Sequence, residues 1–207
     1  MRRDFYRDQL SATAFYKLLT ATVIPRPIAW VSSRSESGVD NLAPHSFFTV
    51  ASTDPPVIQF TSVGEKDSLR NIRATGEFTV NLTSEDLFER VNATGTPFGP
   101  EVSEFDAVGL HREDGKFVST VRVRESPAAL ECRLHSLVPV GNCTLVLGEV
   151  VHAAIREDVL DDDHPRPDSL RPLARLGRDE WSTLGEVRRI SRIRLQDWPG
   201  SFAPEGS

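Results

Sequence analysis

The sequence is poor in cysteine and in long apolar runs. Its 207 residues contain two cysteines, Cys132 and Cys143, too few for a disulfide framework or a cysteine-based zinc site. No stretch approaches the roughly 20 apolar residues of a membrane-spanning helix, and the N-terminal segment MRRDFYRDQL lacks the apolar core of a secretory signal. We therefore expect a cytoplasmic protein that does not enter a membrane.

The chain also lacks an excess of positive charge. Its 30 acidic and 24 basic residues give a net charge of −6, which argues against a nucleic-acid-binding surface. An anionic ligand would need a local group of cations to overcome this field. Only three of the basic residues are lysines, namely Lys17, Lys66 and Lys116, so a single well-placed lysine stands out.

The pattern of apolar residues and turn residues predicts strands with helices inserted between them. The expected strands are 28–33, 46–52, 57–62, 77–82, 128–139 and 143–155, and the expected helices are 11–20, 66–76 and 84–95. We expect hairpins over 28–52 and over 128–155, with the last two strands buried on both faces. Asp67 and Ser84 are the expected N-caps, and Gly76 is the expected end of its helix. The strands are uneven in length and do not alternate strictly with helices, which indicates an antiparallel barrel in a single domain over 1–207, with a core of about 12–195.

The segment TSVGEKDSLRNI (61–72) has the chemistry of an anion site. A strand ends, Gly64 permits a sharp turn, and a helix begins near Asp67 or Ser68. The first N–H groups of a helix lack intrahelical acceptors and carry partial positive charge. Lys66 adds a full charge, and Ser62 and Ser68 add hydroxyl donors, which suits a phosphate. The alternative interpretation of this segment is a capped surface helix beside a solvated lysine.

Two further segments combine aromatic residues with small or cationic ones. Residues 25–48 place small and polar residues beside Trp30, Phe47 and Phe48, so that a flat ligand could approach the backbone closely. Residues 171–185 carry arginines together with Trp181. The alternatives are a hairpin whose aromatics belong to the core, and arginines that balance the aspartates at 161–163.

Other chemistries have little support in the sequence. There is no G-x-S-x-G motif of a serine hydrolase and no G-x-G-x-x-G motif after a strand. The histidine and carboxylate residues of 111–116 and 161–168 lack the spacing of metal ligands. We expect His45 to be a core or interface histidine rather than a catalytic acid. We nominate no catalytic residue and no metal ligand.

Several short segments, taken together and in order, resemble the FMN-binding split-barrel flavin reductase family. They are RPIAWVSS, NLAPHSFF, KDSLRNI, the EF at 104–105, ESPAALEC, LVLGEV and RPLARLG, and they cover roughly Thr22 to Arg194. The resemblance implies a mainly β protein, a six-stranded antiparallel Greek-key split barrel. It also implies a homodimer that binds FMN near the subunit interface.

The resemblance further implies a set of cofactor-binding residues and an activity. The implied residues are Ser32, Ser33, Asn41, Leu42, Ala43, Ser46, Phe47, Ser62, Lys66, Ser68, Asn71, Arg175 and Trp181. Of these, Ser62, Lys66 and Ser68 would hold the phosphate, and Arg175 and Trp181 would close the site, from either subunit. The implied activity is that of an NAD(P)H:flavin oxidoreductase, in which hydride passes from NAD(P)H to flavin.

Some positions depart from the family pattern. Relatives that use NADH often carry Gly-Asp-His at a strand turn where this chain has Gly141-Asn142-Cys143. Ser68 and Trp181 stand where Thr and Tyr are common, and Arg178 replaces a second glycine. FMN binding is therefore better supported than nicotinamide turnover. An electron-transfer or flavin-storage protein and a cofactor-free dimer remain as alternatives, and the sequence names neither the electron acceptor nor a partner monooxygenase.

Overall fold

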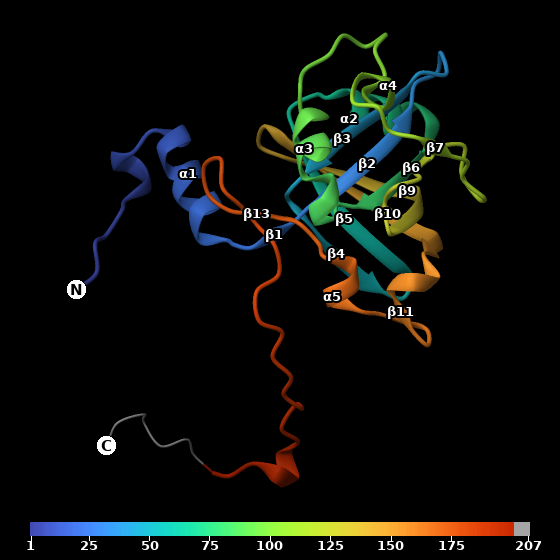
Figure 1. Ribbon diagram of the computed structural model, residues 1–207. Helices are drawn as coiled ribbons and strands as arrows, with labels where there is room; N and C mark the ends of the chain where they lie inside the picture. Colours follow the sequence, from blue (N-terminus) through green and yellow to red (C-terminus); the bar gives the residue numbers. More distant parts are fainter. Residues whose placement is uncertain (201–207) are drawn as a thin grey trace.

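One antiparallel sheet of seven strands forms the body of the protein (Figure 1). The structure is a computed structural model, and it describes residues 1–200. The strands follow the order β3-β2-β6-β9-β10-β5-β4. Their bounds are β2 Ala29–Arg34, β3 Asp40–His45, β4 Phe48–Thr53, β5 Pro56–Val63, β6 Glu77–Leu82, β9 Ala128–Val140 and β10 Cys143–Ile155. The mainly β fold class is as expected, with one more strand in the sheet than the expected six.

The first hairpin differs from the prediction. β2 pairs with β3, from Ala29 opposite His45 to Arg34 opposite Asp40, whereas 46–52 was expected to be its partner. Pro44 is tolerated in β3 because β3 is an edge strand, where a missing N–H costs no ladder hydrogen bond. The chain then breaks at Ser46 and Phe47, and β4 forms a separate hairpin with β5.

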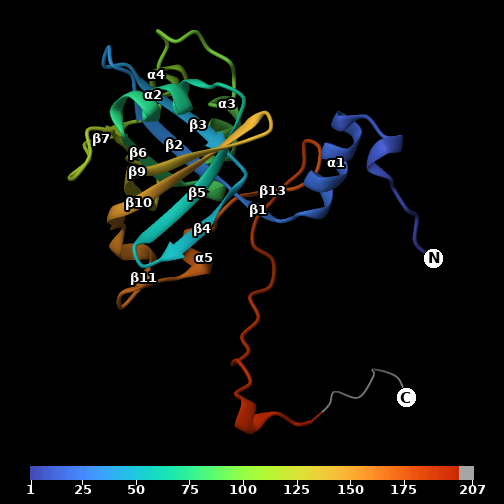
Figure 2. The same ribbon diagram turned by 180° about the vertical axis from the view of Figure 1, so that it is seen from behind.

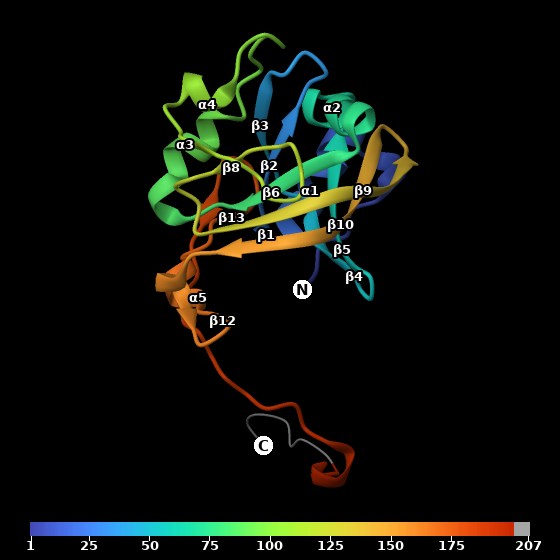
Figure 3. The same ribbon diagram turned by 90° about the vertical axis from the view of Figure 1, so that its right-hand side faces the viewer.

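The two edge strands, β3 and β4, are neighbours in sequence, so the sheet curls back on itself at a seam. At this seam the Thr61 N–H on β5 donates to the Phe47 carbonyl at 2.9 Å. The α2 helix (Asp67–Thr75) and the α4 helix (Glu104–Ala107) lie over the same end of the barrel as β3 (Figures 1 and 3). The seam and these two helices define the position of the candidate site.

The hairpin of β9 and β10 turns at Gly141 and Asn142, as predicted. The expectation that both strands are buried on both faces is wrong, because most residues of β10 are only half-buried and Val138 and Val140 at the turn end of β9 are exposed. The reason is that β6 pairs with β9 only as far as Arg133, so the outer part of the hairpin has no neighbour on that side. In the middle of the hairpin, Gly148 is required, because a Cβ there would collide with the Phe78 ring.

The predicted helices form, with corrections at two caps. α1 (Ala12–Thr22) is capped by Ser11, and α2 ends at Gly76, whose φ of 72° is left-handed. Lys66, rather than Asp67, is the N-cap of α2. The expected helix over 84–95 is a 3-10 turn, Glu85–Leu87, followed by α3 (Phe88–Ala93), and the Ser84 side chain caps nothing.

Short elements complete the chain. They are the strands β1 Arg26–Pro27, β7 Arg112–Glu113, β8 Arg122–Val123, β11 Leu160–Asp161, β12 His164–Pro165, β13 Ala174–Arg175 and β14 Trp181–Ser182, the helix α5 Pro167–Leu170, and 3-10 turns at Arg7–Gln9, Glu157–Val159 and Leu195–Asp197. β1, β13 and β14 form a small sheet beside the barrel.

The N-terminal segment and residues 183–200 extend away from the barrel (Figure 2). α1 stands to one side of the body, and residues 183–200 run outward as an arm. Within residues 1–200, no helix is both long and apolar enough to cross a membrane. The buried core belongs to the barrel and the helix α4 beside it. Its largest side chains are almost completely enclosed, and they are Trp30, Phe60, Phe78 and Phe105.

Candidate functional site

A cavity of about 390 Å³ lies at the seam of the barrel. Residues of β3, the 46–47 link, the end of β5, the start of α2 and the segment 94–98 line it, together with Tyr16 of α1 and Glu104 of α4. The volume is within the range of small-molecule and cofactor sites. The cavity therefore lies between the two edge strands, and residues of α1, α2 and α4 line it.

The cationic group of the cavity is Lys66. Lys66 is the N-cap of α2, and the first intrahelical bond runs from the Arg70 N–H to its carbonyl at 3.0 Å. The N–H groups of residues 67–69 precede this bond and have no acceptor within the helix. The other charged residues at this mouth are already paired, Arg70 with Asp67 and Arg73 with Glu65. Within residues 1–200 Lys66 has no carboxylate within ion-pair distance, so its charge is available to an anion.

A hydrogen-bond network forms the floor of the cavity. The buried carboxylate of Glu104 accepts from the Asn41 Nδ2 at 3.0 Å and from the Leu42 N–H at 2.8 Å. The Asn41 Oδ1 accepts from the Ser68 hydroxyl at 3.0 Å. This network connects α4, β3 and α2, because each of the three side chains belongs to a different element.

Two further residues hold Asn41 from behind. The Ser33 hydroxyl donates to the Asn41 Oδ1 at 3.4 Å and accepts from the Asn71 Nδ2 at 3.1 Å. Both Ser33 and Asn71 are buried, and Asn71 also lines a small neighbouring cavity of about 140 Å³. The position of Asn41 is thus fixed from both strands of the hairpin and from α2.

Two titratable groups of the site have shifted pKa values. Burial raises the pKa of Glu104, and the hydrogen bonds from Leu42 and Asn41 only partly oppose this. Burial, together with the nearby charge of Lys66, lowers the pKa of His45 to about 4, and a hydrogen bond with the Thr61 backbone opposes this only in part. His45 is therefore neutral at pH 7, and its Nε2 lies 3.4 Å from the Ser68 hydroxyl.

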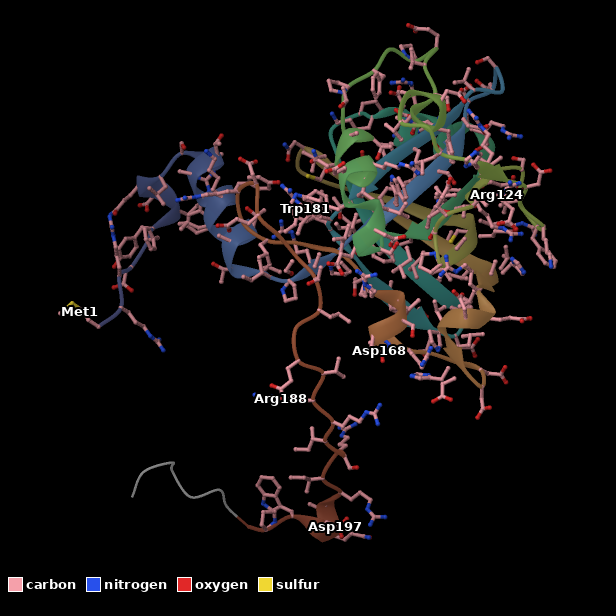
Figure 4. The ribbon with its side chains drawn as sticks, in the orientation of Figure 1. Met1, Arg124, Asp168, Trp181, Arg188 and Asp197 are labelled. Atoms are coloured by element: carbon pink, nitrogen blue, oxygen red, sulfur yellow. The ribbon has the colours of Figure 1, made fainter. Side chains whose placement is uncertain are left out.

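An aromatic side of the site leads to a second hollow. The Phe47 ring contacts Tyr16 edge-on at 6.3 Å between centroids. Pro44, Ser46 and Gly95 line both the cavity and a hollow of about 310 Å³, whose other walls include Arg175 and Trp181. The Arg175 guanidinium lies 4.6 Å from the centroid of the Trp181 ring, and Figure 4 shows Trp181, which belongs to the small sheet, beside the barrel.

The structure brings six of the thirteen predicted residues into the cavity, which are Asn41, Ala43, Ser46, Phe47, Lys66 and Ser68. Ser33 and Asn71 support them, and Arg175 and Trp181 line the adjoining hollow. The remaining three lie outside the lining, and their role in binding stays a prediction. The Ser32 hydroxyl donates to the Val121 carbonyl, the Leu42 side chain packs in the core, and the buried Ser62 hydroxyl donates to the Gly64 carbonyl at 2.9 Å.

Sequence reasoning missed Glu104, Tyr16 and the segment 94–98 as parts of the site. Glu104 and Phe105 were noted only as one of the short segments that carry the family resemblance, with no role in the site. The signal was the pair itself, an acid directly before a phenylalanine that the structure buries completely. The region of Thr94 to Phe98 offered no signal of its own.

The arrangement suits a planar molecule with an anionic end. The anion would meet Lys66 and the N-terminus of α2, while the planar part would lie along β3 and the Phe47 ring. Among the described residues, no group of three or more His, Cys, Asp or Glu side chains could hold a metal ion.

The comparison with protein families decides the affiliation of the chain. The family described as "Flavin reductase like domain" matches residues 21–174. The chain belongs to this family.

Solved structures agree with this flavin reductase-like assignment. Nitrilotriacetate monooxygenase component B from Bacillus cereus is 30% identical, with a TM-score of 0.89, and the match covers 92% of this chain and 99% of that one. The 2-nitrobenzoate 2-nitroreductase NbaA from Pseudomonas fluorescens is also 30% identical, with a TM-score of 0.88 over 96% and 100% of the two chains. Flavoredoxin of Desulfovibrio vulgaris (Miyazaki F), at 21% identity and a TM-score of 0.77 over 92% and 97% of the two chains, shares the fold. The fold is therefore the split barrel of flavin reductase-like proteins.

Proposed function

We propose that the protein binds FMN and acts as an oxidoreductase that transfers hydride from NAD(P)H to the flavin. The observation that carries the proposal is Lys66, a cation without a carboxylate partner in residues 1–200, placed at the N-terminus of α2 inside a cavity of about 390 Å³. A phosphate monoester carries about −1.5 to −2 charges near pH 7, and this site offers it the needed cation. Membership in a flavin reductase-like family supports the same cofactor.

Different residues of the chain would bind different parts of the cofactor. Lys66 and the free N–H groups of α2 would hold the phosphate, while Ala43, Ser46 and the Phe47 ring would border the flat rings. A bound flavin supplies the redox chemistry itself, and the protein contributes position, electrostatics and exclusion of water. The hollow beside Arg175 and Trp181 opens onto the same residues, Pro44 and Ser46, so an electron donor could approach from that side.

We also propose that the protein is a homodimer. α1 presents Leu19 to solvent at 52% exposure, and Val23 and Ile24 follow it at 63% and 46%. Exposed apolar residues of this kind, at the end of a helix that stands off the body, are expected to be covered by another surface. Because Tyr16 of the same helix lines the cavity, a second copy packed on α1 would lie beside the flavin. Light scattering should give twice the 23.0 kDa chain mass, and a monomer would contradict the proposal.

A second function, electron transfer by a bound FMN without turnover of NAD(P)H, is favoured by one feature. Gly141 and Asn142 form the turn between β9 and β10, which begins at Cys143, and the Asn142 carbonyl accepts from the Gly64 N–H at 3.0 Å, close to the phosphate end of the site. The turn thus lies beside the site without the Asp-His pair of NADH-using relatives.

Two measurements test the proposed function. The purified protein should be yellow, or should become yellow with added FMN, and the released cofactor should have the mass of FMN. Rapid mixing of the FMN-loaded protein with NADH or NADPH should then bleach the flavin absorbance near 450 nm, roughly where oxidised flavins absorb. Bleaching supports the oxidoreductase, and bound flavin that is bleached by neither nucleotide supports the electron carrier. A protein that remains colourless in excess FMN contradicts both.

A further inference from the structure

Glu104 is an unusual residue for a cavity that is built to receive an anion. Its side chain is 5% exposed, and it lines the same cavity as Lys66. Within residues 1–200 it has no cationic partner within ion-pair distance, and its two hydrogen-bond donors, Asn41 and Leu42, are neutral. A buried carboxylate without a counter-ion is costly, and a phosphate in the same cavity would increase that cost.

The ionised form of Glu104 dictates the direction of each hydrogen bond in its network. A carboxylate can only accept, so the Asn41 amide must turn its Nδ2 toward Glu104. The Asn41 Oδ1 then faces Ser68, and the Ser68 hydroxyl donates its only proton to it, over 3.0 Å. In this state the Ser68 hydroxyl has no proton left for a phosphate.

The protonated form of Glu104 would reverse these directions. One carboxyl oxygen would still accept from the fixed Leu42 N–H, while the new O–H would donate to the Asn41 Oδ1 after the amide turns over. The Asn41 Nδ2 would then donate to the Ser68 oxygen, and the Ser68 proton would be free for the phosphate. In this second arrangement the Ser33 oxygen, whose hydroxyl donates to the Asn41 Oδ1 in the first, would accept from the turned Nδ2 instead. Both arrangements satisfy the Glu104, Asn41 and Ser68 groups in turn, so the network has two states.

We propose that Glu104, Asn41 and Ser68 form a relay that couples the binding of the flavin phosphate to the uptake of one proton by Glu104. The proton comes from the solvent, and no other bond is made or broken. By linkage, a ligand that favours the protonated state binds more tightly as the pH falls toward that state. The inference rests on the proposed FMN site, and it assigns Glu104 as a positioning residue that acts through Asn41 and Ser68.

The raised pKa of Glu104 fits this relay, because its protonated form lies nearer to neutral pH than that of an ordinary glutamate. The charged groups on the elements around it are mostly paired. Arg112 of β7 binds Asp40 of β3 and Asp106 of α4, and Arg70 binds Asp67 on α2. The other titratable groups that line the cavity are His45, Lys66, Tyr16 and Glu65, and Glu65 pairs with Arg73.

The test compares FMN binding by the wild type and by Glu104→Gln between pH 5 and pH 8.5. Glutamine reproduces the hydrogen-bond pattern of the protonated acid, with its oxygen on the Leu42 N–H and its NH₂ on the Asn41 Oδ1. We expect Glu104→Gln to bind FMN about 2- to 10-fold more tightly at pH 8, the value of one hydrogen bond, and this ratio to fall as the pH is lowered.

Two controls separate the relay from simple charge removal. Glu65→Gln removes a carboxylate from the same cavity without touching the relay, and its ratio to the wild type should be the same at every pH in this range. Riboflavin, which lacks the phosphate, should show no difference between the wild type and Glu104→Gln. Equal or weaker FMN binding by Glu104→Gln at pH 8, or a ratio that does not change with pH, overturns the relay alone. A wild type that binds no FMN overturns the proposed function as well.

A second measurement avoids the glutamine variant, in case it does not fold. Calorimetry of FMN binding at pH 7 in two buffers with different ionisation enthalpies counts the protons taken up. The wild type should take up protons with FMN, and Ser68→Ala, which lacks the hydroxyl end of the relay, should take up fewer. Equal uptake by the two proteins contradicts the relay.

Discussion

Two buried glutamates show how the same side chain serves different purposes in this protein. Glu131, on β9, is 0% exposed and Glu104 is 5% exposed. Glu131 accepts from the backbone N–H groups of Lys116 and Phe117 at 3.0 and 2.7 Å and from the Arg122 guanidinium at 2.9 Å, and His152 lies 3.1 Å away. Glu104 has only the neutral donors Asn41 and Leu42.

The partners decide the pKa of each acid. Burial alone would raise the pKa of Glu131, but the two N–H groups and the charges of Arg122 and His152 outweigh burial, and the pKa is lowered. Burial raises the pKa of Glu104, and its two donors do not compensate. We conclude that Glu131 clamps the segment 116–122 onto the sheet, whereas Glu104 retains an unbalanced charge at the cavity.

Removing Glu131 should give the largest effect. Glu131→Ala leaves the buried Arg122 without its nearest carboxylate, and breaking a buried pair costs about 3–5 kcal/mol. Urea unfolding should therefore show a loss of that order in the free energy of unfolding. In the matched control, Glu113→Ala removes the half-exposed partner of Arg122 and should cost about 1 kcal/mol or less. Equal losses for the two variants would show that Glu131 is not the clamp.

Replacing Lys66 should weaken FMN binding and leave the fold intact. Lys66→Ala removes the one cation of the site that lacks a carboxylate partner in residues 1–200, and the loss of a charge-assisted bond costs about 1.5–3 kcal/mol of affinity. A flavin fluorescence titration measures this change. Lys116→Ala is the control, because it removes a lysine that does not line the cavity. If the two lysine variants bind FMN equally well, the phosphate is held elsewhere.

The pH dependence of stability should have opposite signs for the two glutamates, because their pKa values are shifted in opposite directions. The lowered pKa of Glu131 contributes stability that is present above the ordinary value of 4.5 and is lost as the pH falls through the folded pKa. The raised pKa of Glu104 costs stability as the pH rises from 4.5 through its folded pKa. Relative to the wild type, Glu131→Gln should therefore be least stable at pH 7 and recover toward pH 3.

Glu104→Gln should show the reverse trend in the same unfolding experiment. Its free energy of unfolding, compared with that of the wild type, should be more favourable at pH 7 than at pH 4. Parallel pH profiles for the two variants would contradict the assignment of opposite shifts.

The sequence predicted those parts of the fold that local chemistry determines. The end of α2 at Gly76 and the turn at Gly141 and Asn142 between β9 and β10 were both predicted. Few residue types adopt the left-handed backbone of such positions, so a glycine there is a local signal. The partner of β2 could not be found in this way. Pro44 reads as a strand breaker, and only the position of β3 at the edge of the sheet makes it acceptable.

The candidate site likewise has residues that the sequence could predict and one that it could not. Lys66 and Ser68 could be recognised, because the start of a helix carries a local signature. Glu104 could not, since its role depends on Asn41, which is 63 residues earlier in the chain. Neither propensity nor spacing encodes a contact of that range.

The most direct measurement is a calorimetric titration of the purified protein with FMN and, separately, with riboflavin. If Lys66 and the start of α2 hold the phosphate, FMN should bind at least about tenfold more tightly than riboflavin, as expected for a charge-assisted hydrogen bond. Equal affinity for the two compounds, or no heat with either, would contradict the assignment of this cavity as an FMN site.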